Sequence, residues 1–357
     1  MQGMTSAKWG YVTRRVDDPL ETRLGNAPAC PPGLGSFVVA TVARIGAHEY
    51  LEDPRGRRVR LYPGDVVVGA LGNRYATDFY EGYVPGPGDP VHLLTAGGLI
   101  GTVASAHTSK AEPTVLEVLG TLDDAAGTAL TTDSVAMPLA PEARPPLGTV
   151  VVLGSAMNAG KTTATSSIVR GLNLAGVRAG AGKVTGSGSG KDHWSYVDAG
   201  AATVTDFLDC GMASTFGYPT GRLISAMSAI RNRLVAEGAE AVVLEIADGI
   251  LQDETRALAA ELPGFADAVI LAVGDALGAV AGTRSLAEVG VSVRAVSGLV
   301  TASPLASRET AEATGLPVLN PGALSAGALE LLTSVTLSDE ADQLLRAHGD
   351  RLVSRSA

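Results

Sequence analysis

One continuous run of nine residues combines the side chains and the backbone that bind a phosphate chain. It reads Ser155, Ala156, Met157, Asn158, Ala159, Gly160, Lys161, Thr162 and Thr163. The apolar stretch 149–153 precedes it and a helix-like stretch follows it, which is the strand–loop–helix setting of a phosphate-binding loop. Backbone N–H groups and the helix N-terminus favour an anion there. The pattern therefore predicts that Lys161 reaches the β- and γ-phosphates of a nucleoside triphosphate and that the Thr162 hydroxyl holds Mg²⁺.

Charged residues at or after the ends of other strand-like runs are candidates for the rest of this chemistry. Lys183 ends a short strand and would face the γ-phosphate from the side opposite Lys161, although a plain surface lysine would have the same position in the sequence. Glu245 ends an apolar run, where a buried carboxylate needs a partner. Because Mg²⁺ takes one or two carboxylates besides phosphate oxygens, we expect Glu245 to be a ligand, with Asp198 or Asp206 as the second.

A glycine- and serine-rich segment, 186–194, directly follows Lys183. Glycine permits the backbone movement that a loop needs to close over a substrate. Lys191, His193 and Trp194 would then touch the acceptor. A loop without any direct substrate contact remains an equal alternative.

Aromatic and basic residues gather in the N-terminal half. The aromatic bodies with polar tips suit a substrate pocket or an interface, and they equally suit the rim of a small β-domain core. The arginines between 55 and 60 are expected at the solvated tip of a hairpin. The aromatic cluster consists of Tyr62, Tyr75, Phe79, Tyr80 and Tyr83.

Composition excludes several classes of protein. The net charge of −10 argues against non-specific nucleic-acid binding, which depends on neutralising phosphates. No run of 18 apolar residues occurs, so we expect no membrane partner. The two cysteines, Cys30 and Cys210, have no metal-ligand spacing and suggest no disulfide framework, so the cytoplasm is the expected compartment.

The chain divides at a proline-rich stretch. Residues 1–136 are expected to form an N-terminal arm and a small all-β barrel or sandwich, because short β-branched runs alternate with turn signals. Residues 137–148 carry four prolines and are expected to be a semi-rigid linker. Residues 149–357 alternate apolar strand-like runs with helix-like segments. This alternation predicts an α/β domain with a mainly parallel sheet covered by helices on both faces.

The C-terminal half, residues 148–325, resembles the dethiobiotin synthetase-like branch of P-loop proteins. The loop from Gly154 to Thr163 is similar to that family's Gly-Thr-Asp-x-x-x-Gly-Lys-Thr loop. The segments 182–186, 197–199 and 244–249 resemble its lysine segment, its Ser-Asp-Ala motif and its Glu-Gly-Ala-Gly motif. The N-terminal half has no part in the resemblance.

The resemblance implies a role for each matched residue. Lys183 would contact the γ-phosphate and the reacting carboxylate, and both Asp198 and Glu245 would bind Mg²⁺. Thr301 stands near the place of the family's base-reading asparagine, so ATP is only a preference over GTP. A homodimer would agree with the family's tendency to dimerise.

We therefore expect an ATP- and Mg²⁺-dependent enzyme that transfers the γ-phosphoryl group to a small carboxylate or carbamate, as a ligase or kinase. Catalysis would consist of positioning and of stabilising charge on the transferring group, with Lys161 and Lys183 as the cations. Two other classes stay open. One is a nucleotide-driven switch or chaperone for cofactor or metal insertion, and the other is a module that binds nucleotide only structurally.

Overall fold

The computed structural model describes residues 6–17, 21–25, 33–138, 140 and 145–332, and in it the chain forms two compact units. The first unit comprises residues 1–138, 186–191 and 207–218, and the second comprises 139–185, 192–206 and 219–357. The domain boundaries expected at residues 136 and 149 stay a prediction. Part of the expected linker, residues 139 and 141–144, lies outside the described residues.

The first unit is a β-barrel. Strands β6, β3, β10, β8 and β9 pair in that order, antiparallel throughout, and a parallel pairing of β6 with β9 closes the ring. Closure removes the free edges that an open sheet would expose. The ring strands are β3 (Phe37–Arg44), β6 (Val66–Leu71), β8 (Val91–Leu93), β9 (Leu99–Ala106) and β10 (Thr114–Asp123).

Shorter elements surround this ring. The 3₁₀ helix η1 follows β1, and β4 and β5 form a separate hairpin whose arginines are exposed, as expected. Inward-facing side chains such as Val38, Leu93 and Ile100 fill the barrel. The remaining elements are β1 (Lys8–Trp9), η1 (Tyr11–Thr13), β2 (Arg23–Leu24), β4 (Tyr50–Glu52), β5 (Arg58–Arg60) and β7 (Tyr80–Tyr83).

The aromatic cluster expected in this unit divides into buried and exposed members. Tyr80 is fully buried, and its ring contacts Phe79. Tyr62 is exposed, whereas Tyr75 and Tyr83 are half-exposed and both contact the ring of Phe216. Part of the cluster therefore belongs to the core and part to the surface.

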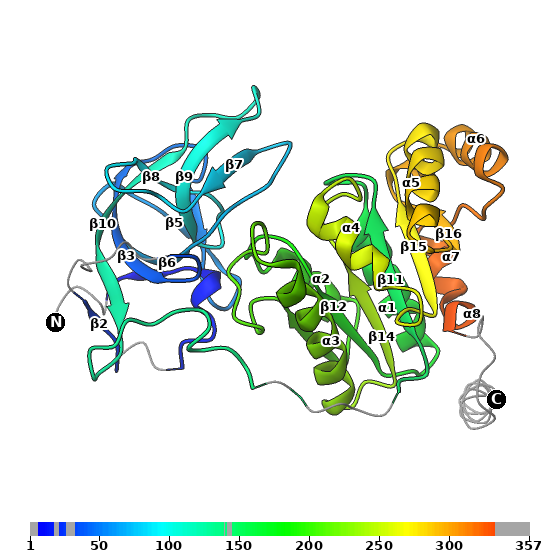
Figure 1. Cartoon of the computed structure of the whole chain (residues 1–357), viewed down its shortest axis with the longest axis horizontal. Coiled ribbons are helices and arrows are strands. Elements are labelled where there is room, and N and C mark those ends of the chain that lie inside the picture. The colour runs from blue at the N-terminus through cyan, green and yellow to red at the C-terminus, as the bar shows by residue number, and fades with distance from the viewer. Residues whose placement is uncertain (1–5, 18–20, 26–32, 139, 141–144, 333–357) are drawn as a thin grey trace. The chain divides into compact units, whose positions relative to one another are not determined.

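The second unit contains a six-stranded parallel sheet in the order β13-β12-β14-β11-β15-β16 (Figure 1). Its strands are buried runs, as expected for a sheet covered on both faces. Strand β11 connects through α1 to β12 on one side, whereas β14 connects through α4 to β15 on the other. The strands are β11 (Thr149–Gly154), β12 (Ala179–Lys183), β13 (Thr203–Asp206), β14 (Ala241–Glu245), β15 (Ala268–Ala272) and β16 (Ala295–Ser297).

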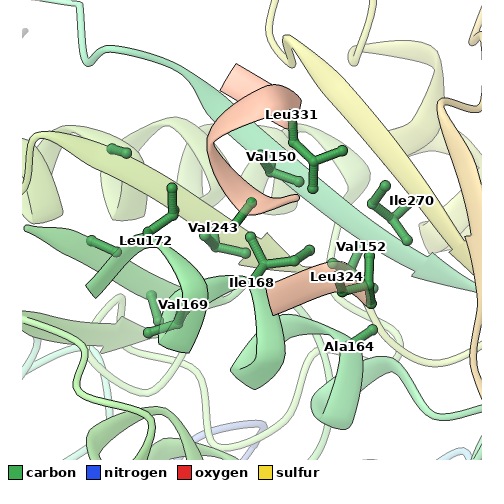
Figure 2. Close-up of a cluster of buried hydrophobic side chains, with 14 of the residues drawn as sticks. Val150, Val152, Ala164, Ile168, Val169, Leu172, Val243, Ile270, Leu324 and Leu331 are labelled. Carbon is green, nitrogen blue, oxygen red and sulfur yellow. The ribbon is translucent and has the colours of Figure 1, made fainter. Parts of the chain in front are cut away.

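Helices flank this sheet on both faces (Figure 1). On one face, Ile168 and Leu172 of α1 pack with Val150 and Val152 of β11, and Leu324 of α7 completes the layer (Figure 2). The helices are α1 (Lys161–Leu174), α2 (Lys191–Asp198), α3 (Thr220–Ala236), α4 (Asp253–Ala260), α5 (Ala276–Glu288), α6 (Pro304–Thr314), α7 (Pro321–Ala326) and α8 (Ala328–Leu332), with the 3₁₀ helix η3 (Leu299–Ala302) before α6.

Helix α3 covers the opposite face and lies very close to β12. A Cβ atom added to Gly182 would stand 2.6 Å from Cγ2 of Ile230, a distance that no ordinary packing allows. Because neighbouring strand residues face opposite ways, Lys183 points to the other face, toward α1 and α2. Among the described residues, no helix has the length and apolar character needed to cross a membrane.

Candidate functional site

The phosphate-binding loop predicted from the sequence lies between β11 and α1, at the carboxyl edge of the sheet. Gly160 precedes the helix with a φ of 102°, and a Cβ there would stand 2.8 Å from the Cα of Gly298. No side chain caps the start of α1. The first-turn N–H groups of a helix have no partner within the helix, so this end can receive an anion.

Lys161 folds back over the loop. Its Nζ atom donates to the carbonyl oxygens of Ala156, at 2.9 Å, and Asp248, at 2.5 Å. Burial lowers the pKa of Lys161 from its ordinary value, although the carboxylates of Glu245 and Asp248 act in the opposite direction. Both hydrogen-bond acceptors are neutral carbonyls, so a phosphate oxygen can replace them with a stronger, charged acceptor.

Three charged residues form a row across neighbouring strands. Lys183 of β12 stands in register with Asp206 of β13 on one side and with Glu245 of β14 on the other. Residues in register on parallel strands face the same way, and these three are at the carboxyl ends of their strands. Glu245 and Asp206 are almost fully buried, so the two carboxylates of this row lie in the interior and not on a solvated surface.

Asp192, in the first turn of α2, connects this row to the phosphate-binding loop. Its Oδ1 accepts the hydroxyl hydrogen of Thr162 at 3.0 Å, and its Oδ2 forms an ion pair with Lys183. Burial alone would lower the pKa of Lys183, but Asp192 and Glu245 outweigh it and raise that pKa above its ordinary value. Lys183 therefore stays charged.

Tyr196 holds the other carboxylate. It is one turn after Asp192 on the same face of α2, and its hydroxyl donates to Oε2 of Glu245 at 2.5 Å. The Lys183 Nζ atom lies 3.7 Å from Oε1 of the same carboxylate. Burial raises the pKa of Glu245, while Lys183 opposes that shift. Burial and Glu245 together raise the pKa of Tyr196, so its hydroxyl remains a donor.

The other residues expected in the site have different positions. Asp198 is the exposed last residue of α2, and within the described residues no hydrogen bond or ion pair joins it to Thr162, Lys183 or Glu245. Six residues turn a helix by about 600°, so Asp198 faces away from the side of α2 that carries Asp192. Its role as a metal ligand stays a prediction.

Thr301 lies in η3, and its hydroxyl donates to the carbonyl of Gly298 at 2.8 Å. That segment contacts the phosphate-binding loop, since the Leu299 amide donates to the carbonyl of Ala159 at 3.0 Å. The structure therefore brings Thr301 near the loop, although its hydroxyl is engaged with its own turn. Within the loop, Met157 is half-buried, and Asn158 is exposed with a φ of 60°.

Asp192 and Tyr196 were missed in the sequence as site residues. The glycine- and serine-rich composition predicted a loop as far as residue 194, whereas α2 begins at Lys191. The signal was an acidic residue two positions after Gly190, the last glycine of that segment, because a helix N-terminus favours a carboxylate. Tyr196 follows four residues later, which is the helical spacing.

Oxygen atoms dominate the candidate metal ligands. Thr162, Asp192 and Glu245 offer a hydroxyl and two carboxylates, the hard donors that Mg²⁺ prefers together with phosphate oxygens and water. No cluster of three or more acidic, histidine or cysteine residues with metal-binding geometry occurs in the described part of the chain. The donor set therefore fits a cation that arrives with a phosphate chain better than a separate, permanent metal centre.

A separate cavity of about 720 Å³ lies at the opposite edge of the sheet, where β15 and β16 begin. Leu262, Val291 and Leu316 are among its lining residues. None of the predicted site residues lines it. The charged residues connected through Asp192 and Lys183 lie at the phosphate-binding edge, so we place the candidate site there.

A parallel sheet whose central strand leads through a Gly-Lys-Thr loop into a helix is the fold of a P-loop NTPase. The second unit has this fold. Its loop lies beside β14, where the connections of two adjacent strands leave in opposite directions, and ligands bind at such a point in open α/β sheets.

Comparison with family models and with curated proteins gives no match. Among solved structures, similar chains include the signal recognition particle receptor FtsY from Elizabethkingia anophelis, at 14% identity and a TM-score of 0.32 over 56% of this chain and 58% of the other. Signal recognition particle 54 kDa protein from Aeropyrum pernix, in complex with GDP, has 16% identity and a TM-score of 0.38 over 63% and 54%. Chloroplast FtsY from Physcomitrella patens has 17% and 0.35 over 61% and 69%.

These likenesses are weak, with TM-scores below 0.5, and carry no argument about activity. The first two matches span little more than half of those chains. The resemblance to the dethiobiotin synthetase-like branch therefore rests on the sequence motifs alone.

Proposed function

We propose that this protein binds a nucleoside triphosphate with Mg²⁺ at the β11–α1 loop and transfers the γ-phosphoryl group to a small acceptor, a carboxylate or carbamate. The observation that carries the proposal is the connection of Thr162 to Lys183 through Asp192. Asp192 joins Thr162, the residue of α1 that is expected to contact the metal, to Lys183 at the end of β12. A lysine placed only for solubility would have no such connection.

Each side chain has a part in this proposal. Lys161 exchanges its two carbonyl acceptors for phosphate oxygens. Thr162, Asp192 and Glu245 would hold Mg²⁺, which would neutralise charge on the phosphates. Lys183 stabilises the charge that develops on the transferring group, and Tyr196 fixes the Glu245 carboxylate. Fixed charges of this kind act without reorganisation during the reaction.

A nucleotide-driven switch is the second candidate, and a specific observation favours it. The chain passes from the first unit to the second between Lys191 and Asp192. Segment 186–191 is held in the first unit, where Glu52 accepts hydrogen bonds from Ser189 at 3.1 Å and from the Gly190 amide at 2.9 Å. A shift of Asp192 on nucleotide binding would pull directly on that segment. Such coupling would serve a switch that acts on a protein partner.

The test measures ADP or GDP release from Mg-ATP and Mg-GTP, alone and with pooled small carboxylic acids and amines. Lys161→Ala is the blank, and Lys110→Ala, a lysine of the barrel unit, is the matched control. Stimulation by one pool supports phosphoryl transfer to a small acceptor. Slow release that no pool changes supports the switch. Nucleotide binding that survives Lys161→Ala unchanged would exclude both.

The preference between ATP and GTP is measured in the same series by titrating the protein with fluorescent analogues of each nucleotide. Thr301→Asn is the informative variant. An asparagine amide reads a purine edge with both a donor and an acceptor, so a change in the ATP-to-GTP ratio places Thr301 beside the base. An unchanged ratio removes that role. The cytoplasmic location stays a prediction.

A further inference from the structure

Three aromatic side chains of the first unit form one continuous, partly exposed surface. The rings of Tyr75 and Tyr83 each contact the ring of Phe216, with centroid distances of 5.3 Å and 5.9 Å. The ring planes are tilted by 53° and 48°, so no ring is covered by stacking flat on another. Tyr75 and Tyr83 are 37% and 41% exposed, and Phe216 is half-buried. We call Tyr75, Tyr83 and Phe216 the aromatic triad.

A side-chain amide holds the aromatic triad in place. The Nδ2 atom of Asn73 donates to the carbonyl oxygen of Phe216 at 3.3 Å, and its Oδ1 atom accepts the amide hydrogen of Val84 at 2.9 Å. Val84 directly follows Tyr83. Gly217 has a φ of 82°, and a Cβ there would stand 2.6 Å from Nδ2 of Asn73, so this position accepts only glycine. The rings are therefore positioned before any ligand arrives, which reduces the entropy lost on binding.

The aromatic triad differs from other tyrosines of the same unit in having no cation over its rings. Arg58 lies 4.6 Å from the ring centroid of Tyr50, and Lys8 lies 5.3 Å from that of Tyr62. Among the described residues, no lysine or arginine has such a position over a ring of the triad. The face of an aromatic ring attracts a cation. The triad therefore offers ring faces that a cation from outside the chain can use.

A carboxylate stands at the tip of one of these rings. The Tyr83 hydroxyl donates to Oε1 of Glu81 at 2.6 Å, and the Ser105 hydroxyl donates to Oε2 at 2.7 Å. These two hydrogen bonds lower the pKa of Glu81 from its ordinary value, so the carboxylate is charged at neutral pH. The only basic residue between positions 73 and 89 is Arg74, which is buried. The surroundings of the triad therefore favour positive charge.

We propose that the aromatic triad binds a small molecule that carries a trimethylammonium group. The methyl groups of such a cation would pack against the rings, and its charge would be attracted both by the ring faces and by Glu81. A trimethylammonium group has no N–H, so it needs no free acceptor on a carboxylate whose two oxygens already accept hydrogen bonds. An ordinary ammonium is strongly hydrated, and aromatic faces offer no acceptors that would replace its water.

The binding can be measured without nucleotide, so it does not depend on the proposed function. The full chain is titrated with choline, and the N-methyl resonance of choline is followed by NMR. The neutral analogue 3,3-dimethylbutanol has the same shape without the charge and should bind roughly tenfold more weakly. We expect Phe216→Leu, Tyr83→Leu and Glu81→Gln each to raise the dissociation constant for choline about threefold to fivefold. Thermal unfolding of each variant verifies that it is folded.

The chain offers a matched control in Tyr62→Leu. Tyr62 is an exposed tyrosine of the same unit that already has Lys8 over its ring, so its loss should leave the dissociation constant unchanged. The proposal is overturned by a wild-type chain that does not bind choline, and equally by one that binds the neutral analogue as tightly. Binding that Phe216→Leu and Glu81→Gln both leave intact, or that the control weakens to the same extent, would also overturn it. Lys161→Ala should bind choline like wild type whether or not the chain proves to be an NTPase.

Discussion

Replacing Tyr196 by phenylalanine tests the buried part of the site most directly. The substitution removes one hydroxyl and leaves the ring volume in place. That hydroxyl donates to Oε2 of Glu245 at 2.5 Å, and both residues are at most 1% exposed. Without it the carboxylate oxygen loses a donor that water does not readily replace. A hydrogen bond to a charged group contributes about 1.5–3 kcal/mol, so we expect a loss of about 2 kcal/mol.

For a unit of this size, 1 kcal/mol shifts the midpoint of thermal unfolding by about 2–4 °C, so Tyr196→Phe should lower it by about 4–8 °C. The chain has two tryptophans, Trp9 and Trp194, and the latter lies in α2. In a Trp9→Phe background, Trp194 fluorescence therefore reports the second unit. Tyr62→Phe, at a tyrosine that is 57% exposed, is the matched control. A midpoint within 1 °C of the parent would show that this hydrogen bond contributes nothing, and the argument for a held Glu245 would fail.

Three further changes test other parts of the molecule. Burial lowers the pKa of His48 to about 4. Because the unfolded chain binds this proton more readily than the folded one, the free energy of unfolding should fall by about 3 kcal/mol between pH 6.5 and pH 4. His48→Gln should therefore flatten the dependence of the unfolding midpoint on pH in this range. The control His107→Gln, at an exposed histidine, should keep the dependence. Gly154→Ala would bring a Cβ to 3.0 Å from Lys161 Nζ and should weaken nucleotide binding about tenfold in a fluorescence titration, with a normal melting midpoint. Gly182→Ala overpacks α3 and should cost about 1–3 kcal/mol in urea unfolding, without a direct effect on the site.

Local patterns predicted most of the regular elements. The β-branched runs at 37–42, 66–71, 99–103 and 115–119 became β3, β6, β9 and β10, because residues of that type fit a pleated, half-buried surface. The parallel sheet and its covering helices followed from apolar runs that alternate with helical periods. Lys161 and Thr162 could be named as candidates because a phosphate-binding loop is a local feature, with its residues consecutive in the chain.

Tertiary contacts decided what the sequence could not. Lys183 could be placed at the end of a short strand, but the strand reads Ala-Gly-Ala-Gly-Lys, and its lack of large side chains is explained only by the close approach of α3 to Gly182. The β6–β9 pairing that closes the barrel joins strands distant in sequence, which no periodicity reveals. Asp192 was not recognised because its contacts are with Thr162 on α1 and Lys183 on β12, and the family resemblance favoured Asp198 instead.

The two lysines of the site differ in what a phosphate must displace. Lys161 donates to two neutral carbonyls, whereas Lys183 lies beside two carboxylates, Asp192 and Glu245. Hydrogen bonds between charged groups are about twice as strong as neutral ones, so a triphosphate competes easily at Lys161 and poorly at Lys183. In the proposed site, Lys161 would therefore be the lysine that supplies binding energy. Lys183 can act on a phosphate only once Asp192 has another cation to contact, and this dependence would tie the second lysine to the arrival of Mg²⁺ with the nucleotide.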